Sequence, residues 1–350
     1  MNLPKKKKIT IYILLVSVMF LLICWDFISV DMNLTVPGTF RLESDFDAVS
    51  SATCKVSIVP SDYQLLTNPS SRDDNLSYEQ IEDMVKNAIA LQGGLEWIID
   101  AGDKVMIKVN LVGGNSPSGE GENTDVRVVK ALIKCIADYT NNNVEIIVAE
   151  GTARTNDNPS EASSVWGNSG YTDLLADSYL SGINIQLLNL NQSRTDMIEV
   201  NLGATGTSAP QEYSYQVHKS ILEADVYIAV PVLKIHDTGI TNALKLQIGI
   251  APGCIYGYPK ALGTEYSDGI FHTVEHRIWT TEAIVDLSNI AGIDFVLVDA
   301  IMCLEREKVY KGDNQVRMNT IIAGADPVAV DHVSAKLLSL NPDDVSHISL

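Results

Sequence analysis

The chain has 350 residues, of which 46% are hydrophobic and 20% charged, and its formal net charge at pH 7 is −19. A nucleic-acid-binding surface needs a cluster of basic side chains, so we expect no nucleic acid among the partners. The acidity also argues against a domain that lies flat on anionic lipid.

The N-terminus has the pattern of a membrane-targeting segment. Four lysines, Lys5 to Lys8, precede an apolar run from Ile9 to Val30. The run is about 20 residues, long enough to cross a bilayer as a helix, and no small-x-small cleavage site follows it. We therefore expect residues 1–8 to be a cytoplasmic tail and residues 9–30 a signal anchor, with the rest of the chain outside the cytoplasm as a single-pass membrane protein. A cleaved signal and a lipoprotein signal at Cys24 are the alternatives.

Residues 31–53 mix polar residues with Pro37 and Gly38, which favours a stalk, and residues 54–350 alternate strand and helix patterns. Strands are predicted over 55–60, 104–110, 144–149, 183–190, 224–232, 293–298 and 319–323. Helices are predicted over 77–99, from 123 or 124 to 139, and over 168–178, 238–248, 272–290 and 326–339. Ser77 and Gln80 predict a capping box at the start of the first. Near-continuous apolar strands separated by helices indicate an α/β domain with a mostly parallel sheet flanked by helices.

Polar residues lie at the carboxyl ends of the second and third predicted strands. Ligands gather at the carboxyl ends of strands in open α/β sheets, so Lys108, Asn110 and Glu150 are candidate ligand-binding residues. Gly113 and Gly114 lie in a Gly-rich loop whose N–H groups could approach an anion. The alternatives are a surface loop and, for Glu150, structural hydrogen bonding.

The segment after the 224–232 strand carries two lysines and a histidine. Lys234 and His236 are two residues apart, so they face the same side of an extended chain end. Lys245 lies on the helix predicted next. These side chains could bind an anionic substrate or supply an acid or base, so we assign them a candidate catalytic role. The alternative is that the lysines are surface charges and His236 ends the strand.

His272, Glu275 and His276 match the H-x-x-E-H pattern of zinc peptidases, in which two histidines bind the metal. A divalent metal held by one of them with His236 is a second interpretation. Solvated helix residues are the third. No two of the five cysteines are close in sequence, so we expect no iron–sulfur cluster.

Two late carboxylates complete the candidate catalytic set. Asp299 ends the strand predicted over 293–298, and Asp331 lies among apolar residues of the last predicted helix. Asp326 precedes Pro327 at the start of that helix, which predicts an N-cap.

The succession of KVMIKVNLV, VPVLKIH with TNALKLQIG, VLVDAI and IIAGADPVAVD resembles domain-of-unknown-function family 362 over about residues 55–345. The resemblance implies family equivalents for Lys108, Asn110, Thr124, Asp125, Lys234, His236, Lys245, Asp299, Asp326 and Asp331. The chain departs from the family pattern in two ways. Leu246 replaces the asparagine that usually follows the second lysine, and charged residues replace a Gly-rich stretch after Cys303.

Three functions are consistent with these patterns. The first is an enzyme that acts on a small anionic or carbonyl substrate. The second is a non-catalytic binding module displayed on the membrane. The third is a zinc-dependent hydrolase built on His272 and His276.

Overall fold

The predicted strands assemble into one mixed sheet in the computed structural model. The structure describes residues 54–61, 75–112, 117–152, 159–202, 214–236, 238–257, 260, 263–264, 267–268, 277–305 and 315–350. Among these residues, nine strands form the sheet in the order β1-β13-β12-β7-β2-β3-β4, with β8 beside β12 and β9 beside β8. The nine strands are β1 (Val56–Pro60), β2 (Lys104–Val109), β3 (Glu145–Glu150), β4 (Asn184–Asn189), β7 (Val226–Val230), β8 (Val232–His236), β9 (Gly239–Thr241), β12 (Phe295–Leu304) and β13 (Gln315–Gly324). The α/β class predicted from the sequence is confirmed.

The sheet is parallel from β12 through β7, β2 and β3 to β4, whereas β13 and β1 join antiparallel at one edge. Two small antiparallel hairpins lie outside it: β5 (Met197–Asn201) with β6 (Ser214–His218), and β10 (Gly263–Thr264) with β11 (Ser267–Asp268). The parallel part explains why its strands read as continuous apolar runs, since both faces are covered.

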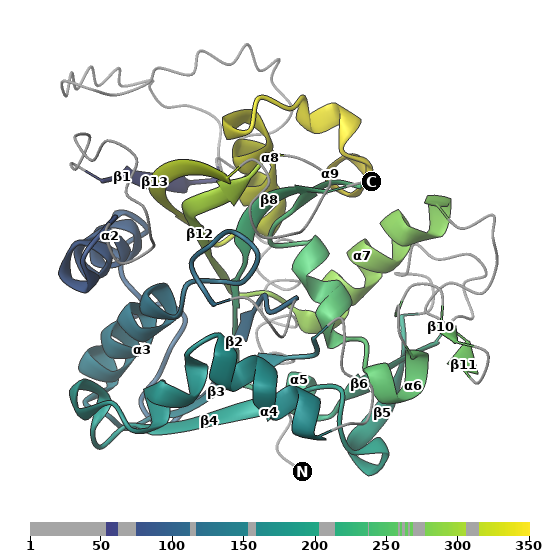
Figure 1. Cartoon of the computed structure of the whole chain (residues 1–350), viewed down its shortest axis with the longest axis horizontal. Helices are drawn as coiled ribbons and strands as arrows, with labels where there is room; N and C mark the ends of the chain where they lie inside the picture. The colour runs from purple at the N-terminus through teal and green to yellow at the C-terminus, as the bar shows by residue number, and fades with distance from the viewer. Residues whose placement is uncertain are drawn as a thin grey trace, which may run out of the picture. The chain divides into compact units, whose positions relative to one another are not determined.

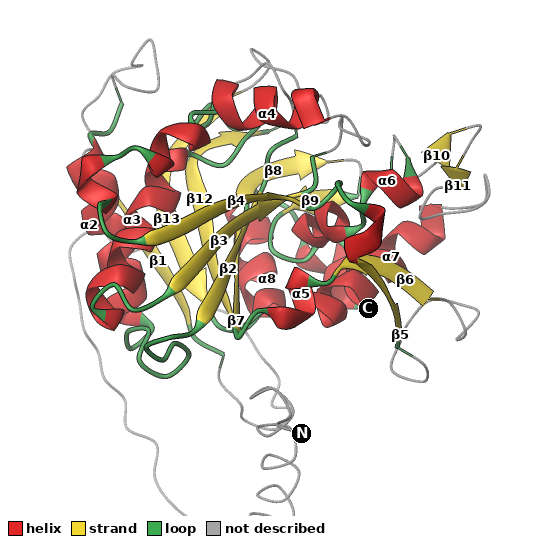
Figure 2. Ribbon diagram, turned by 90° about the horizontal axis from the view of Figure 1, so that it is seen from below, coloured by secondary structure: helices red, strands yellow, loops and turns green. Residues whose placement is uncertain are grey.

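Helices cover both faces of the sheet (Figures 1 and 2). Ile107 of β2 shares a hydrophobic cluster with Leu132 of α3 (Val126–Thr140), whereas its neighbour Met106 shares one with Leu287 of α7 (Arg277–Ala291) on the opposite face. This alternation is the two-residue period of a strand. The helices are α2 (Tyr78–Leu91), α3 (Val126–Thr140), α4 (Pro159–Asn168), α5 (Ser220–Glu223), α6 (Gly253–Tyr256), α7 (Arg277–Ala291), α8 (Pro327–Leu337) and α9 (Ser346–Ser349).

Helix ends follow the local capping residues. Ser77 and Gln80 form the predicted capping box of α2, and Asp326 caps α8 with Pro327 in its first turn, so both predictions are confirmed. The N-cap of α3 is Asp125, not Asn123 or Thr124. The helix predicted to reach residue 99 ends at Leu91, because glycines with positive φ follow at 93 and 94.

Two predicted helices are wrong. Residues 238–248 form β9 and then a 3-10 helix, Lys245–Ile250, because Gly239 turns the chain back so that β9 pairs with β8. Residues 168–178 contain the 3-10 helix Tyr171–Leu175 and the start of a second, Ser178–Leu180. Further 3-10 helices span Arg194–Asp196 and Pro342–Asp344.

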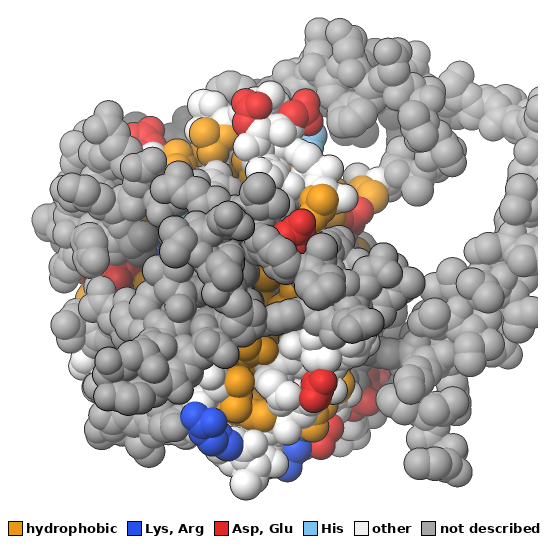
Figure 3. Space-filling view, turned by 90° about the vertical axis from the view of Figure 1, so that its right-hand side faces the viewer, with side chains coloured by type: hydrophobic (Ala, Val, Ile, Leu, Met, Phe, Trp, Pro, Cys, Tyr) orange, Lys and Arg blue, Asp and Glu red, His pale blue; other side chains and the backbone are white. Residues whose placement is uncertain are grey.

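No helix in the described part of the chain combines the length and apolar character needed to span a bilayer. The predicted tail, transmembrane helix and stalk, residues 1–53, lie outside the described residues. On the face drawn in Figure 3, described acidic side chains are scattered, and the described lysine and arginine side chains lie at the lower edge.

Candidate functional site

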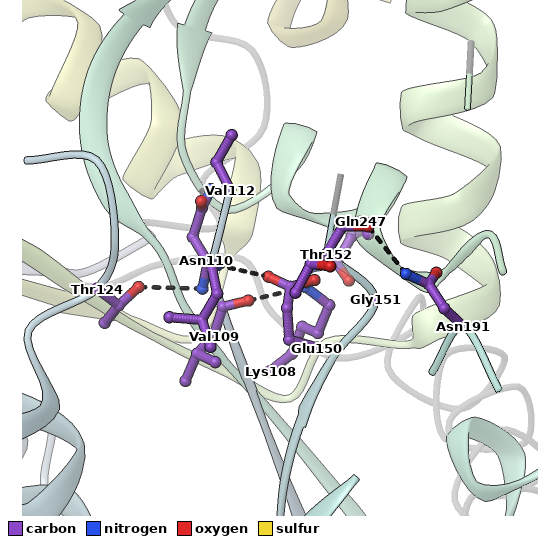
Figure 4. Close-up of polar contacts among 12 residues, drawn as sticks. Lys108, Val109, Asn110, Val112, Thr124, Glu150, Gly151, Thr152, Asn191 and Gln247 are labelled. Atoms are coloured by element: carbon purple, nitrogen blue, oxygen red, sulfur yellow. Dashed lines mark hydrogen bonds and ion pairs between the residues drawn. The ribbon is translucent and has the colours of Figure 1, made fainter. Parts of the chain in front are cut away.

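The strand order reverses between β2 and β7, and the carboxyl ends of these strands are tied together by one hydroxyl group. β3 and β4 extend the sheet on one side of β2, and β7 and β12 lie on the other. The backbone N–H of Asn110 donates to Thr124 Oγ1 at 3.0 Å, and this hydroxyl donates to the carbonyl of Val230 at 2.9 Å (Figure 4). Ligands of open α/β sheets bind at such a reversal point.

A buried ion pair lies beside this point. Lys108 Nζ is 2.8 Å from Glu150 Oε1 and also donates to the carbonyl of Val109 at 2.8 Å. The other carboxylate oxygen of Glu150 accepts from the N–H of Leu111 at 2.8 Å. Both side chains point toward one another from neighbouring strands (Figure 4). Burial lowers the pKa of Lys108, and the charge of Glu150 opposes that shift.

Lys234 approaches the same region from β8. Its amine donates to the carbonyl of Glu122 at 2.7 Å and to Asn110 Oδ1 at 3.3 Å. Burial lowers the pKa of Lys234 to about 8, against the opposing charges of Glu122 and Glu150. The amine is therefore bonded to neutral oxygen atoms in a buried site, where the charged form of an amine is energetically unfavourable.

A third buried lysine, Lys260, was not singled out in the sequence. Its amine donates to the carbonyls of Gly151 and Gly249, and burial lowers its pKa to about 7. Gly151 allows this approach, since a Cβ there would lie 2.9 Å from Lys260 Nζ and would overlap the carbonyl oxygen of Gly249. Gly151, just after the third predicted strand, is the local feature of the sequence that could have indicated a close approach of this kind.

The two predicted catalytic aspartates are bonded to backbone amides. Asp299 accepts from the N–H of Asp125 at 2.8 Å and from that of Ile301 at 3.1 Å. Asp331 accepts from the N–H groups of Ala243 and Leu244 at 2.8 and 3.1 Å. Burial raises the pKa of Asp331 to about 7, and burial and the charge of Asp125 raise that of Asp299.

The remaining predicted residues are distributed around this region. Thr124 and Asp125 are buried at the start of α3, and Asp125 pairs with Arg127 at 2.7 Å. His236 ends β8 and is half-buried. Lys245 lies in the 3-10 helix, where its amine donates to Thr241 Oγ1 at 3.2 Å.

Among the described residues, no group of three or more His, Cys, Asp or Glu side chains could hold a metal ion. His272, Glu275 and His276 lie outside the described residues, as do Gly113 and Gly114. The zinc-site and Gly-rich-loop interpretations therefore stay predictions.

Comparison with known proteins finds a family, one relative by sequence and a weak match to one solved structure. The family model "Domain of unknown function (DUF362)" matches residues 105–336. A thylakoid-associated protein of Synechocystis sp. is 26% identical over 256 residues, which cover 71% of this chain and 67% of the relative. The lactate racemase apoprotein of Thermoanaerobacterium thermosaccharolyticum matches with a TM-score of 0.45 and 13% identity. That match covers 73% of this chain and about half, 54%, of the racemase chain.

Proposed function

The chain belongs to the DUF362 family, and we propose that its folded domain binds a small anionic molecule at the carboxyl ends of β2, β3 and β7. The observation that carries this proposal is the charge balance of the buried lysines. Lys108, Lys234 and Lys260 are each influenced by the charge of Glu150, and Glu122 is the further carboxylate that acts on Lys234. Three amines and two carboxylates leave one positive charge to be balanced when all are ionised.

An anionic ligand would balance that charge. Among the described ion pairs, Lys108 has a carboxylate partner, whereas the bonds described for Lys234 and Lys260 go to neutral oxygens. A buried ammonium group gains most from an anion, because the interaction strengthens as the local dielectric constant falls. The reversal of strand order between β2 and β7 supports the same position.

Binding can be tested with inorganic phosphate, acetate and pyruvate as probes, by thermal shift and calorimetry on the purified chain. We expect at least one probe to stabilise the wild type and to lose that effect in Lys234→Met and Lys260→Met. Lys130→Met is the matched control, since Lys130 is a partly exposed lysine paired with Asp177. Equal stabilisation of all four proteins would contradict the proposal.

The same site supports an enzymatic role, since an amine with a pKa near neutrality exchanges protons readily. In this reading Lys234 is the base, and His236 on the same strand is a second proton carrier. Exchange of pyruvate methyl protons in deuterium oxide, measured by NMR, tests it. Exchange that is lost in Lys234→Met supports an enzyme, whereas binding without exchange favours the non-catalytic binding module.

We also propose that residues 9–30 anchor the chain to a membrane. The apolar run after four lysines supports this proposal, as does the relative described as thylakoid-associated. Each arginine at the centre of a spanning helix costs about 2.5–3.5 kcal/mol. The double variant Leu15→Arg/Leu21→Arg should therefore move the chain from carbonate-washed membranes to the soluble fraction, and unchanged membrane retention would contradict an anchor.

A further inference from the structure

A cavity whose lining includes none of Lys108, Lys234 and Lys260 lies between α7, α8 and α9. Its volume is about 300 Å³, and its apolar lining includes Leu244, Val285, Ile293, Val328 and Ile348. This volume is at the lower end of the range for small-molecule pockets, which are typically apolar with a few polar groups that orient the ligand.

His347 is one of the polar residues of the lining, with Ser288 and Asn289. It is 2% exposed, and neither ring nitrogen has a hydrogen-bond partner among the described residues. Burial, with a smaller effect from the charge of Lys245, lowers the pKa of His347 to about 4, so the ring is neutral at pH 7. A neutral imidazole offers one N–H donor and one acceptor nitrogen. Buried polar atoms are rarely left without partners, so the ring points to a missing partner.

We propose that this cavity is a binding site for a small, uncharged, mainly apolar molecule that carries a hydroxyl group. The described residues that line the cavity include no Asp, Glu, Lys or Arg, which disfavours a charged ligand. A hydroxyl group both donates and accepts, so it complements the neutral His347 ring. The apolar walls would bind the remainder of the molecule.

Phenol and toluene are suitable probes because they differ mainly in the hydroxyl group. We expect the purified full chain to bind phenol about tenfold more tightly than toluene, as one or two hydrogen bonds would give. Long-range proton–nitrogen NMR spectra should show that phenol shifts the ring nitrogens of His347. His347→Phe should bind the two probes equally, and Val328→Trp, which fills the cavity from its exposed side, should bind neither.

Three results would overturn the proposal: no binding of either probe, equal affinity of the wild type for both, or a phenol preference that persists in His347→Phe. The first would mean that water alone occupies the cavity. Val328→Trp keeps the test available if His347→Phe fails to fold, because it leaves the ring in place. Lys234→Met should bind phenol like the wild type. A failure of the cavity proposal is therefore distinguishable from a failure of the anion-site proposal.

Discussion

The amine of Lys108 lies 2.8 Å from Glu150 Oε1, on neighbouring parallel strands, with both side chains buried. The two residues are 42 positions apart in the sequence. The contact exists because β2 and β3 pair in parallel, with Lys108 opposite Ala149. This pair fixes one carboxylate among three buried amines.

Removal of the carboxylate should strongly destabilise the fold. Glu150→Gln leaves the Lys108 ammonium buried without its partner, so we expect a loss of about 3–5 kcal/mol in the free energy of unfolding. The double variant Lys108→Met/Glu150→Gln should recover part of the lost free energy of unfolding, because it no longer buries an unpaired ammonium group. Lys134→Met removes the exposed pair with Asp138 and should cost less than about 1 kcal/mol. Urea unfolding measures all three, and a loss for Glu150→Gln no larger than this control would contradict the assignment.

Gly249 should tolerate no side chain. A Cβ there would lie 2.6 Å from both Lys108 Nζ and Glu150 Oε1, so Gly249→Ala should cost about 1–3 kcal/mol through overpacking. Gly167→Ala is the matched control, because a Cβ at that helical position meets nothing within 4 Å. The control should be neutral or stabilising by up to about 1 kcal/mol. Equal effects of the two substitutions on the urea midpoint would refute this reading.

Thr124 should contribute more through its hydroxyl than through its volume. Thr124→Val keeps the shape but leaves the N–H of Asn110 and the carbonyl of Val230 without this partner. We expect a loss of about 1–3 kcal/mol in the free energy of unfolding. Thr124→Ser keeps the hydroxyl and should lose less. If the valine variant proves the more stable of the two, the hydroxyl bridge does not hold the strand ends together.

Lys234 should make the protein more stable as the pH rises. Its folded-state pKa of about 8 is below its ordinary value of 10.5, so the unfolded state binds more protons between these values. Stability therefore increases with pH in this window, by about 3 kcal/mol for this group. Chemical denaturation at pH 8 and pH 10 should show a rise in wild type that is smaller in Lys234→Met. Identical slopes would mean that the amine titrates normally.

Asp331 should have the opposite dependence. Its pKa is raised from 3.8 to about 7, so the folded state binds more protons between these values and loses stability as the pH rises through them. The expected loss for this group is on the order of 4 kcal/mol. Asp331→Asn should not show this loss with rising pH, although the substitution weakens the bonds to Ala243 and Leu244 at every pH. Unfolding free energies are measured at pH 4.5 and 7.5, and an equal change in the wild type and the variant would contradict the prediction.

The predicted Lys234, His236 and Lys245 set illustrates how far local patterns reach. Strand periodicity correctly put Lys234 and His236 on one strand end, because neighbouring residues determine that geometry. Lys245 was predicted on a helix that follows directly. The chain instead turns at Gly239 into β9, and the Lys245 amine donates to Thr241, which lies opposite Lys234 in the β8–β9 pair. Pairing with a neighbouring strand outweighed local helix preference here.

Local patterns along the chain were enough to predict the α/β class, the capping box at Ser77 and the cap at Asp326, because apolar periodicity and capping involve neighbouring residues. They also identified the polar residues at strand ends. The partners of those residues became known from the fold: Glu150 for Lys108, Asn110 for Lys234, and the amides of Ala243 and Leu244 for Asp331. These contacts join residues 42 to 124 positions apart, so they depend on which strands lie side by side. Strand order arises from packing of the whole domain, and local spacing along the chain does not encode it.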